Sequence, residues 1–137
     1  MKKIVTFSIL AYLLITINSR GITQDSEKLE NKNMLKIGVL LPLSGKFKDI
    51  GENFLRAIQL ATYDISNKNI KIYPKDSKGN ALNAYLAAKE FEEEGISIVI
   101  GPIFFKNLER LNEVNNVTFI SITNKTQNIP KNIIAFG

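Results

Sequence analysis

The stretch Lys36-Ile37-Gly38-Val39-Leu40-Leu41-Pro42-Leu43-Ser44-Gly45 is a nearly continuous apolar run that ends in a turn containing Pro, Ser and Gly. Three further β-branched runs, at residues 70–73, 96–100 and 117–120, also end in short turns rich in Gly, Pro, Ser, Thr or Asn. Helical patterns fill the intervals between these runs, and the alternation predicts a parallel sheet. A strand as uniformly apolar as residues 37–41 is typical of a sheet that helices cover on both faces.

Two of the intervals carry amphipathic helices. In the first, Asp49 and Glu52 have the spacing of a capping box. In the second, Asn80 is the expected N-cap and Gly95 is the expected C′ residue. The predicted buried stripes consist of Ile50, Phe54, Ala57, Ile58, Ala61 and Ile65 in the first helix and of Ala84, Tyr85, Ala88 and Phe91 in the second.

A third helix and a fifth strand complete the predicted fold. Leu108, Leu111 and Val114 lie on one side of a helical pattern, which predicts a helix over residues 107–115. Residues 133–136 form a further short apolar run with the character of a strand. The expected fold class is therefore α/β, a Rossmann-like three-layer lobe with a mostly parallel sheet.

The N-terminal residues are predicted to be a targeting segment. Two lysines precede an uncharged stretch at residues 4–17, which matches a secretory signal and is shorter than the roughly 20 residues of a membrane span. We expect a signal peptide over residues 1–21, with an uncleaved anchor as the alternative. Residues 22–34 carry alternating charge and few apolar side chains, so we expect a flexible leader there and a folded region at 35–137.

Composition excludes several classes of function. The 137-residue chain has a formal net charge of +5, which falls to +2 without the three basic residues of the predicted signal. The other lysines are scattered among acidic residues, so no nucleic-acid-binding patch is predicted. The sequence contains no cysteine and no histidine, which excludes disulfides, a lipid-modified cysteine and the commonest general base. Phosphate-binding glycine motifs and nucleophile elbows are also absent, so we expect no enzymatic activity, no cofactor and no metal.

The turns that follow the predicted strands are the candidate site. Ligands of parallel α/β sheets bind beyond the carboxyl ends of the strands, where these turns lie. The Ser44 hydroxyl and nearby backbone amides could face a ligand, and Phe105 could stack on one; the alternatives are an ordinary turn and a core phenylalanine. Lys106 could contact an anion, with a solvated lysine as the alternative. Asp76, after the second strand, is expected to cap a turn or a helix.

The order of these segments resembles the first lobe of a type I periplasmic binding protein, a family that includes branched-chain amino acid receptors and penicillin-binding protein activators. The resemblance spans about residues 36–137 and rests on the opening stretch, on Asp76-Ser77-Lys78-Gly79-Asn80, on Gly95-Ile96-Ser97-Ile98-Val99-Ile100-Gly101-Pro102 and on Phe119-Ile120-Ser121-Ile122-Thr123-Asn124. It implies a two-lobed, non-catalytic receptor, so we expect this lobe to be incomplete and the second lobe to be missing. It also implies half of a ligand cleft, formed by Ser44, Gly45, Gly101, Pro102, Phe105, Ser121, Thr123 and Asn124.

Two functions follow from the resemblance. The first is the periplasmic solute-binding component of an ABC-type transport system, which takes an amino-acid-like small molecule and meets a membrane permease. The alternative is an activator-like module that regulates peptidoglycan synthesis through contact with a peptidoglycan synthase. Amino acid receptors place serines after the third-strand turn, whereas this chain has Ile103-Phe104-Phe105-Lys106, a difference that favours the activator branch. Both functions imply export to the periplasm, and the lack of cysteine excludes a lipoprotein.

Overall fold

The computed structural model describes residues 34–124 and 127–136. The predicted signal peptide and nearly all of the predicted leader lie outside the described residues. Within the described ranges, no helix is long and apolar enough to cross a membrane.

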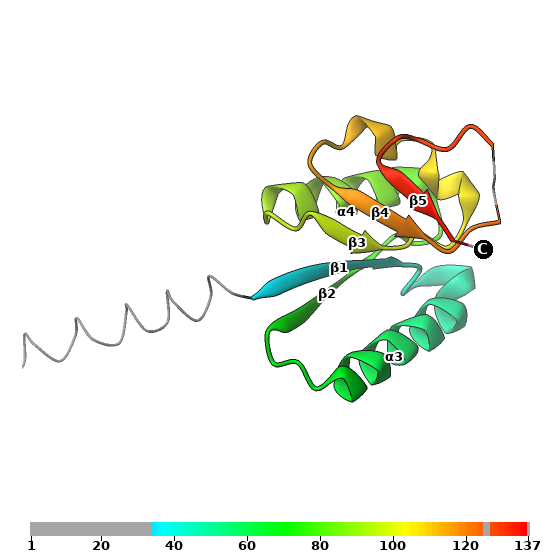
Figure 1. Cartoon of the computed structure of the whole chain (residues 1–137). Coiled ribbons are helices and arrows are strands. Elements are labelled where there is room, and N and C mark those ends of the chain that lie inside the picture. The colour runs from blue at the N-terminus through cyan, green and yellow to red at the C-terminus, as the bar shows by residue number, and fades with distance from the viewer. Residues whose placement is uncertain (1–33, 125–126, 137) are drawn as a thin grey trace, which may run out of the picture. The chain divides into compact units, whose positions relative to one another are not determined.

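A five-stranded parallel sheet forms the centre of the fold, as predicted (Figure 1). The strand order is β2-β1-β3-β4-β5, and all four neighbouring pairs are parallel. The predicted runs overlap the strands, although β1 and β2 are longer and β3 is shorter than expected. The strands are β1 (Leu35–Leu41), β2 (Ile70–Asp76), β3 (Ile98–Ile100), β4 (Thr118–Ser121) and β5 (Ile133–Ala135).

Helices cover both faces of this sheet and make the predicted three layers (Figure 1). Helix α3 (Lys48–Ile65) packs on β1 and β2 from one side. Helix α4 (Ala81–Glu93) lies on the other side, together with two 3₁₀ segments, η2 (Phe105–Leu108) and η3 (Leu111–Glu113). The three-layer α/β architecture is therefore confirmed.

The main core lies between the sheet and α4. Phe91 of α4 is fully buried over Gly38 of β1, where an added Cβ would lie 3.0 Å from the Phe91 ring and 2.9 Å from Val99. The glycine thus leaves room for the phenylalanine against the sheet. The buried residues that share this core are Leu40, Ala84, Ala87, Ala88, Phe91, Ile96, Val99, Leu108, Leu111, Val114, Val117, Phe119 and Ile133.

Both predicted ends of α4 are confirmed. At its start, the Asn80 side-chain oxygen accepts a hydrogen bond from the Asn83 backbone N–H at 3.0 Å. At its end, Gly95 adopts φ +68° and its N–H bonds to the Glu92 carbonyl, while the N–H of Ile96 bonds to the Phe91 carbonyl at 2.9 Å. This pair of bonds is a Schellman motif, and it delivers the chain directly toward β3.

The predicted capping box of α3 is wrong. The helix begins at Lys48, one residue before Asp49, and its N-cap Phe47 makes no side-chain cap. The reason is that a 3₁₀ turn, Gly45–Phe47, runs straight into the helix, so Asp49 lies inside the first turn. There its negative carboxylate interacts favourably with the positive N-terminal end of the helix dipole.

The buried stripe of α3 is also rotated from the predicted one. Gly51 is the buried residue of α3. It lies so close to the β1 exit that an added Cβ would be 2.0 Å from the Pro42 carbonyl oxygen. Phe54 and Ile58 are half-buried, as the prediction requires. Four predicted stripe residues are instead exposed, namely Ile50, Ala57, Ala61 and Ile65. Because α3 covers only β1 and β2, the flank with these residues has no described element packed on it.

The predicted helix over residues 107–115 is wrong as well. This segment forms the 3₁₀ segments η2 and η3, although Leu108, Leu111 and Val114 are buried as expected. These three residues recur every three positions, which is the period of a 3₁₀ helix and not the 3.6 of an α-helix. The asparagines of the segment are also poor helix formers.

The α3 side of the sheet is open over β3, β4 and β5. Ile98, Ile100 and Ile120 point to this side and are only partly buried. Ile134 of β5 pairs with Ile120 and has 56% of its surface exposed. We call these four isoleucines the open face; within the described residues, no helix covers them.

Candidate functional site

The predicted site residues lie where β1, β3 and β4 end, at one edge of the sheet (Figure 1). Short polar bonds tie neighbouring exits together. The Leu43 N–H after β1 donates to the Asp76 carboxylate at 2.8 Å, and the Ser121 hydroxyl at the end of β4 donates to the Pro102 carbonyl at 2.5 Å. The exits therefore form one continuous edge, as the sequence predicted.

At the first exit, Ser44 is held by Asp76. The Asp76 carboxylate accepts hydrogen bonds from the Ser44 side chain and from the backbone N–H groups of Lys78, Leu43 and Ser44. Partial burial acts to raise the pKa of Asp76, but these hydrogen bonds outweigh it and hold the pKa below the ordinary value of an aspartate. Asp76 thus caps its turn, as predicted. Gly45 beside it is exposed, at φ +73°.

At the third exit, Gly101 and Pro102 are buried. Gly101 has φ +105°, and an added Cβ would lie 2.2 Å from the Leu40 carbonyl oxygen. Its N–H donates to the Ile120 carbonyl at 2.8 Å. Glycine at this position therefore lets the β3 exit approach the backbone of β1 closely.

At the fourth exit, the polar side chains differ in exposure. Ser121 is fully buried and Thr123 is 4% exposed. Asn124 is exposed. The Ser121 carbonyl also accepts from the Phe136 N–H at 2.8 Å, which joins this exit to the end of β5. Asn124 is therefore the polar side chain of this exit that is open to a ligand.

Three aromatic rings line the edge, and the sequence did not place one of them, Phe47, at this edge. Phe47, in the 3₁₀ turn after β1, packs against Phe104 with ring centroids 4.6 Å apart. A Cβ added at Gly79 would lie 2.8 Å from the Phe47 ring, so Phe47 also closes over the β2 exit. Phe105 is 48% exposed and Lys106 is exposed. The contact of Phe47 joins segments far apart in sequence, and no local pattern could have found it.

The polar side chains of this edge are mostly engaged in internal hydrogen bonds. In the part of the chain that the structure describes, no cluster of acidic side chains could hold a metal ion. The Ser44 and Ser121 hydroxyls are both used in internal hydrogen bonds, and no histidine exists to activate them. Among the predicted site residues, Gly45, Phe105 and Asn124 are accessible, whereas Gly101, Pro102, Ser121 and Thr123 are buried.

Residues 34–133 match the family of periplasmic binding proteins, and the chain belongs to this family. Proteins of this family are generally non-catalytic. Among curated proteins, no sequence matches this chain significantly.

Solved structures share the fold. The leucine-binding protein LivK from Thermotoga maritima is 19% identical with a TM-score of 0.66, over 74% of this chain and 32% of LivK. An ABC-transporter solute-binding protein from R. palustris, in complex with 4-hydroxybenzoate, is 20% identical with a TM-score of 0.65, over 74% and 31% of the two chains. The C-domain of LpoA from Haemophilus influenzae, a regulator of PBP1A, is 22% identical with a TM-score of 0.60, over 74% and 32%. The chain thus spans about a third of the length of these proteins.

Proposed function

We propose that this member of the periplasmic binding protein family is an exported, non-catalytic ligand-binding protein that acts as the solute-binding component of an ABC-type transport system. The observation that carries the proposal is the edge where the exits of β1, β3 and β4 meet and expose Gly45, Phe105 and Asn124. In parallel α/β sheets this edge is where ligands bind. Similarity to a leucine-binding protein and to a 4-hydroxybenzoate complex supports a small organic ligand.

The predicted site residues take two different roles in this proposal. Phe105 supplies a ring for stacking, Asn124 supplies an amide, and the backbone at Gly45 supplies N–H and C=O groups. Ser44, Gly101, Pro102, Ser121 and Thr123 position the loops. This division follows from burial and from the internal hydrogen bonds of the Ser44 and Ser121 hydroxyls. A membrane permease is the partner that the transport role requires.

A second candidate is an activator-like module that contacts a peptidoglycan synthase. The observation that favours it is the half-exposed Phe105 ring beside the exposed Lys106, where amino acid receptors carry serines. Aromatic side chains are enriched in protein interfaces relative to the rest of the surface. Similarity to the C-domain of LpoA, described as a regulator of PBP1A, supports the same candidate.

An NMR titration tests the first candidate. Leucine and 4-hydroxybenzoate are added separately to the full isotope-labelled chain, and backbone shifts are followed residue by residue. We expect saturable shifts at Gly45, Phe105 and Asn124 with one of the two ligands. Phe105→Ala should weaken that binding by about tenfold, because it removes the stacking ring. Leu60→Ala on α3, another exposed apolar residue, is the matched control and should leave binding unchanged.

The second candidate predicts a different outcome. Neither small molecule would shift these residues, and a purified peptidoglycan synthase would bind the chain with an affinity that Phe105→Ala reduces and Leu60→Ala does not. Ligand shifts that map outside the strand exits would contradict the site itself.

A further inference from the structure

The side of α3 that points away from the sheet carries large apolar side chains. Leu60 follows Gly51, the buried residue of this helix, by about two and a half turns, so the two residues face opposite ways. Leu60 is 62% exposed and Tyr63 is 81% exposed. The outer side of a helix on a sheet is ordinarily polar, and exposed apolar patches mark interaction sites. We call five exposed residues of this side the outer patch, namely Arg56, Ala57, Leu60, Tyr63 and Asp64.

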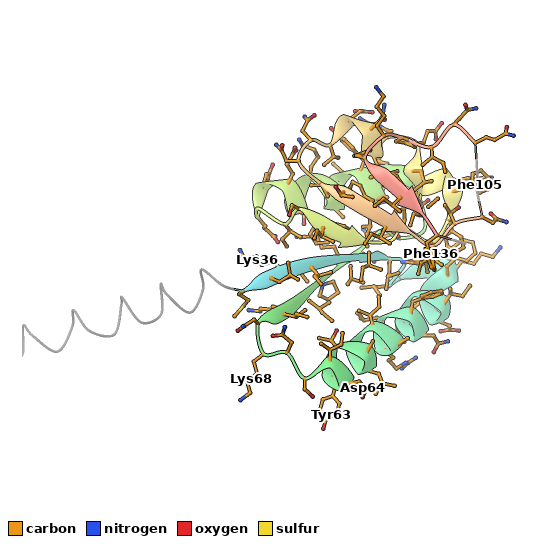
Figure 2. The ribbon with its side chains drawn as sticks, viewed as in Figure 1. Lys36, Tyr63, Asp64, Lys68, Phe105 and Phe136 are labelled. Atoms are coloured by element: carbon orange, nitrogen blue, oxygen red, sulfur yellow. The ribbon has the colours of Figure 1, made fainter. Side chains whose placement is uncertain are left out.

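Two opposite charges flank Leu60 at equal distances along the helix. Arg56 lies one turn before Leu60 and Asp64 lies one turn after it, and both are exposed. Figure 2 shows Asp64 projecting from α3 beside Tyr63, away from the sheet. Because side chains four positions apart form one ridge on a helix, the ridge reads cation, apolar, anion. Its charges exchange sign when the ridge is reversed about Leu60.

A ridge with this pattern is complementary to a second copy of itself. When two copies of α3 pack antiparallel around a twofold axis beside Leu60, positions equidistant from Leu60 meet. Arg56 of each copy then meets Asp64 of the other, which makes two ion pairs around a contact between the Leu60 side chains. A parallel arrangement would place like charges together, so the pattern selects the antiparallel one. Glu52 and Lys68 repeat the relation further out, with Lys68 in the loop that follows α3 (Figure 2).

The present contacts of these two charges leave them available to a second copy. Arg56 lies 3.8 Å from the Glu52 carboxylate and donates to the Asn53 side-chain oxygen at 3.1 Å, but its side chain is 66% exposed. Exposed pairs of this kind contribute little to stability, so Arg56 can turn toward another carboxylate at small cost. Among the residues that the structure describes, none forms an ion pair with Asp64.

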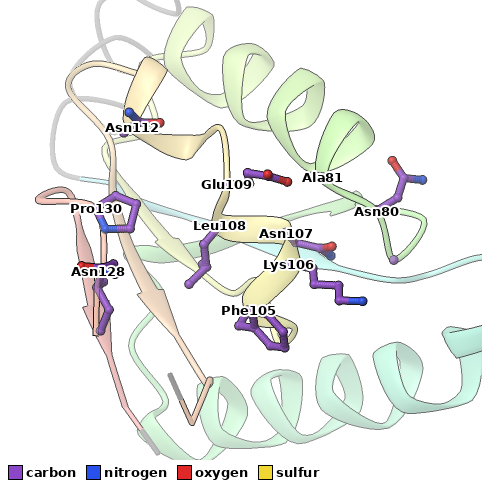
Figure 3. Close-up of a pocket in the computed structure, with 12 residues that line it drawn as sticks. Asn80, Ala81, Phe105, Lys106, Asn107, Leu108, Glu109, Asn112, Asn128 and Pro130 are labelled. Atoms are coloured by element: carbon purple, nitrogen blue, oxygen red, sulfur yellow. The ribbon is translucent and has the colours of Figure 1, made fainter. Parts of the chain in front are cut away.

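The outer patch is separate from the strand exits. The hollow of about 940 Å³ beside the exits is lined by residues 79–81, 105–109, 112 and 128–130, all of them outside α3 (Figure 3). Gly45, Phe105 and Asn124, which are accessible at the exits, are also outside this helix. Association through α3 and ligand binding at the exits therefore use different surfaces.

We propose that the outer patch is a self-association surface, at which two copies of this chain pack α3 against α3 in antiparallel orientation. Leu60 and Tyr63 supply the apolar contact, and two reciprocal Arg56–Asp64 pairs fix the register. Helix α3 has 18 residues and is about 27 Å long, so one helix pair buries less area than a standard interface of roughly 1,600 Å². We therefore expect a weak dimer, with a dissociation constant of roughly 50–500 µM. This function is additional to ligand binding and does not depend on it.

Sedimentation equilibrium of the full chain, from about 20 µM to about 1 mM, tests the proposal. We expect the average mass to rise from that of one chain toward that of two. Arg56→Glu and Asp64→Lys should each weaken association about tenfold or more, because each places like charges together. Both substitutions in one chain should restore association, and so should an equal mixture of the two single variants, because opposite charges meet again in each case.

Lys131→Glu is the matched control for these variants. It reverses an exposed cation outside α3, so it changes the net charge as much as Arg56→Glu does, and it should associate as the parent chain does. Circular dichroism of each variant shows that the fold is retained. All variants keep residues 1–33, so any association through that segment is common to them.

Two results would overturn the proposal. One is an average mass that stays at one chain up to about 1 mM, which would make the outer patch an ordinary solvated surface. The other is association that the single charge reversals leave intact, or that the mixture of the two variants does not restore, which would place the contact on another surface. Leucine and 4-hydroxybenzoate should shift the strand-exit residues equally in the parent and in Arg56→Glu, so failure here is distinguishable from failure of the ligand site.

Discussion

Asp76 connects two strand exits through one carboxylate. Its oxygen Oδ1 lies 2.8 Å from the backbone nitrogens of both Leu43 and Lys78, and the Ser44 side chain is a further donor. The sequence indicated a cap at Asp76, since acidic residues often close turns. It did not indicate that the Ser44 hydroxyl would be one of the groups Asp76 holds, because that contact joins β1 and β2 exits that are more than 30 residues apart. Ser121 was predicted to face a ligand for the same reason, because its hydroxyl bonds to the Pro102 carbonyl, 19 residues away in the sequence.

We predict that Asp76→Asn lowers the free energy of unfolding by about 1–2 kcal/mol at pH 7, because it weakens hydrogen bonds to a charged acceptor. The folded-state pKa of Asp76 lies below its unfolded-state pKa, so the charged form stabilises the fold fully above the unfolded-state pKa and progressively less as pH falls through the folded-state pKa. The difference between parent and variant should therefore shrink below pH 4. Urea unfolding at pH 7 and at stepped acidic pH measures it.

Asp64→Asn is the control for this experiment. Asp64 projects outward from α3 and is exposed (Figure 2). We expect its unfolding free energy to change by less than about 0.5 kcal/mol. A gap between parent and Asp76→Asn that stays constant down to pH 2 would contradict the role assigned to the Asp76 charge.

At the scale of elements, local signals predicted α4 well and the segment before β4 poorly. The N-cap and C′ positions of α4 depend on residues within a few positions of its ends, so the sequence contains the necessary information. The parallel direction of the strands also follows from the alternation of patterns, whereas the strand order was not predicted. The segment at residues 105–114 depends instead on Asn132, whose side-chain nitrogen donates to carbonyls in and just after this segment. These bonds join residues 15 to 21 positions apart in the sequence, and no local pattern encodes them.

Asn132 gives the prediction at this scale. Asn132→Ala deprives the carbonyls of Leu111, Val114 and Val117 of their shared donor, and we expect a loss of about 1–3 kcal/mol in urea unfolding. Asn115→Ala changes an exposed asparagine of the same region and should cost less than about 0.5 kcal/mol. Equal midpoints for the two variants would show that the Asn132 bonds do not hold this segment.

At the scale of the whole molecule, the two faces of the sheet differ. The side of the sheet that faces α4 encloses a continuous core. On the side that faces α3, the open face of Ile98, Ile100, Ile120 and Ile134 is not covered by any described helix. The sequence predicted two covered faces, because the strands are uniformly apolar. It could not predict that α3 would lie over β1 and β2 alone, because the lateral position of a helix on a sheet depends on packing such as Gly51 against Pro42.

Adjacent residues of β5 provide the sharpest test of this asymmetry. Ile133 is 7% exposed in the core and Ile134 is 56% exposed on the open face, since neighbouring strand residues point to opposite sides. We predict that Ile134→Lys changes the free energy of unfolding by less than about 1 kcal/mol and lowers the fluorescence of a bound hydrophobic dye, because a charge interrupts the apolar patch. Ile133→Lys buries a cation without a partner and should cost about 3 kcal/mol or more. The parent chain and both variants share every other apolar segment, so dye bound elsewhere contributes equally to each. Similar destabilisation by the two variants, or unchanged dye fluorescence in a folded Ile134→Lys chain, would mean that the open face is covered in solution.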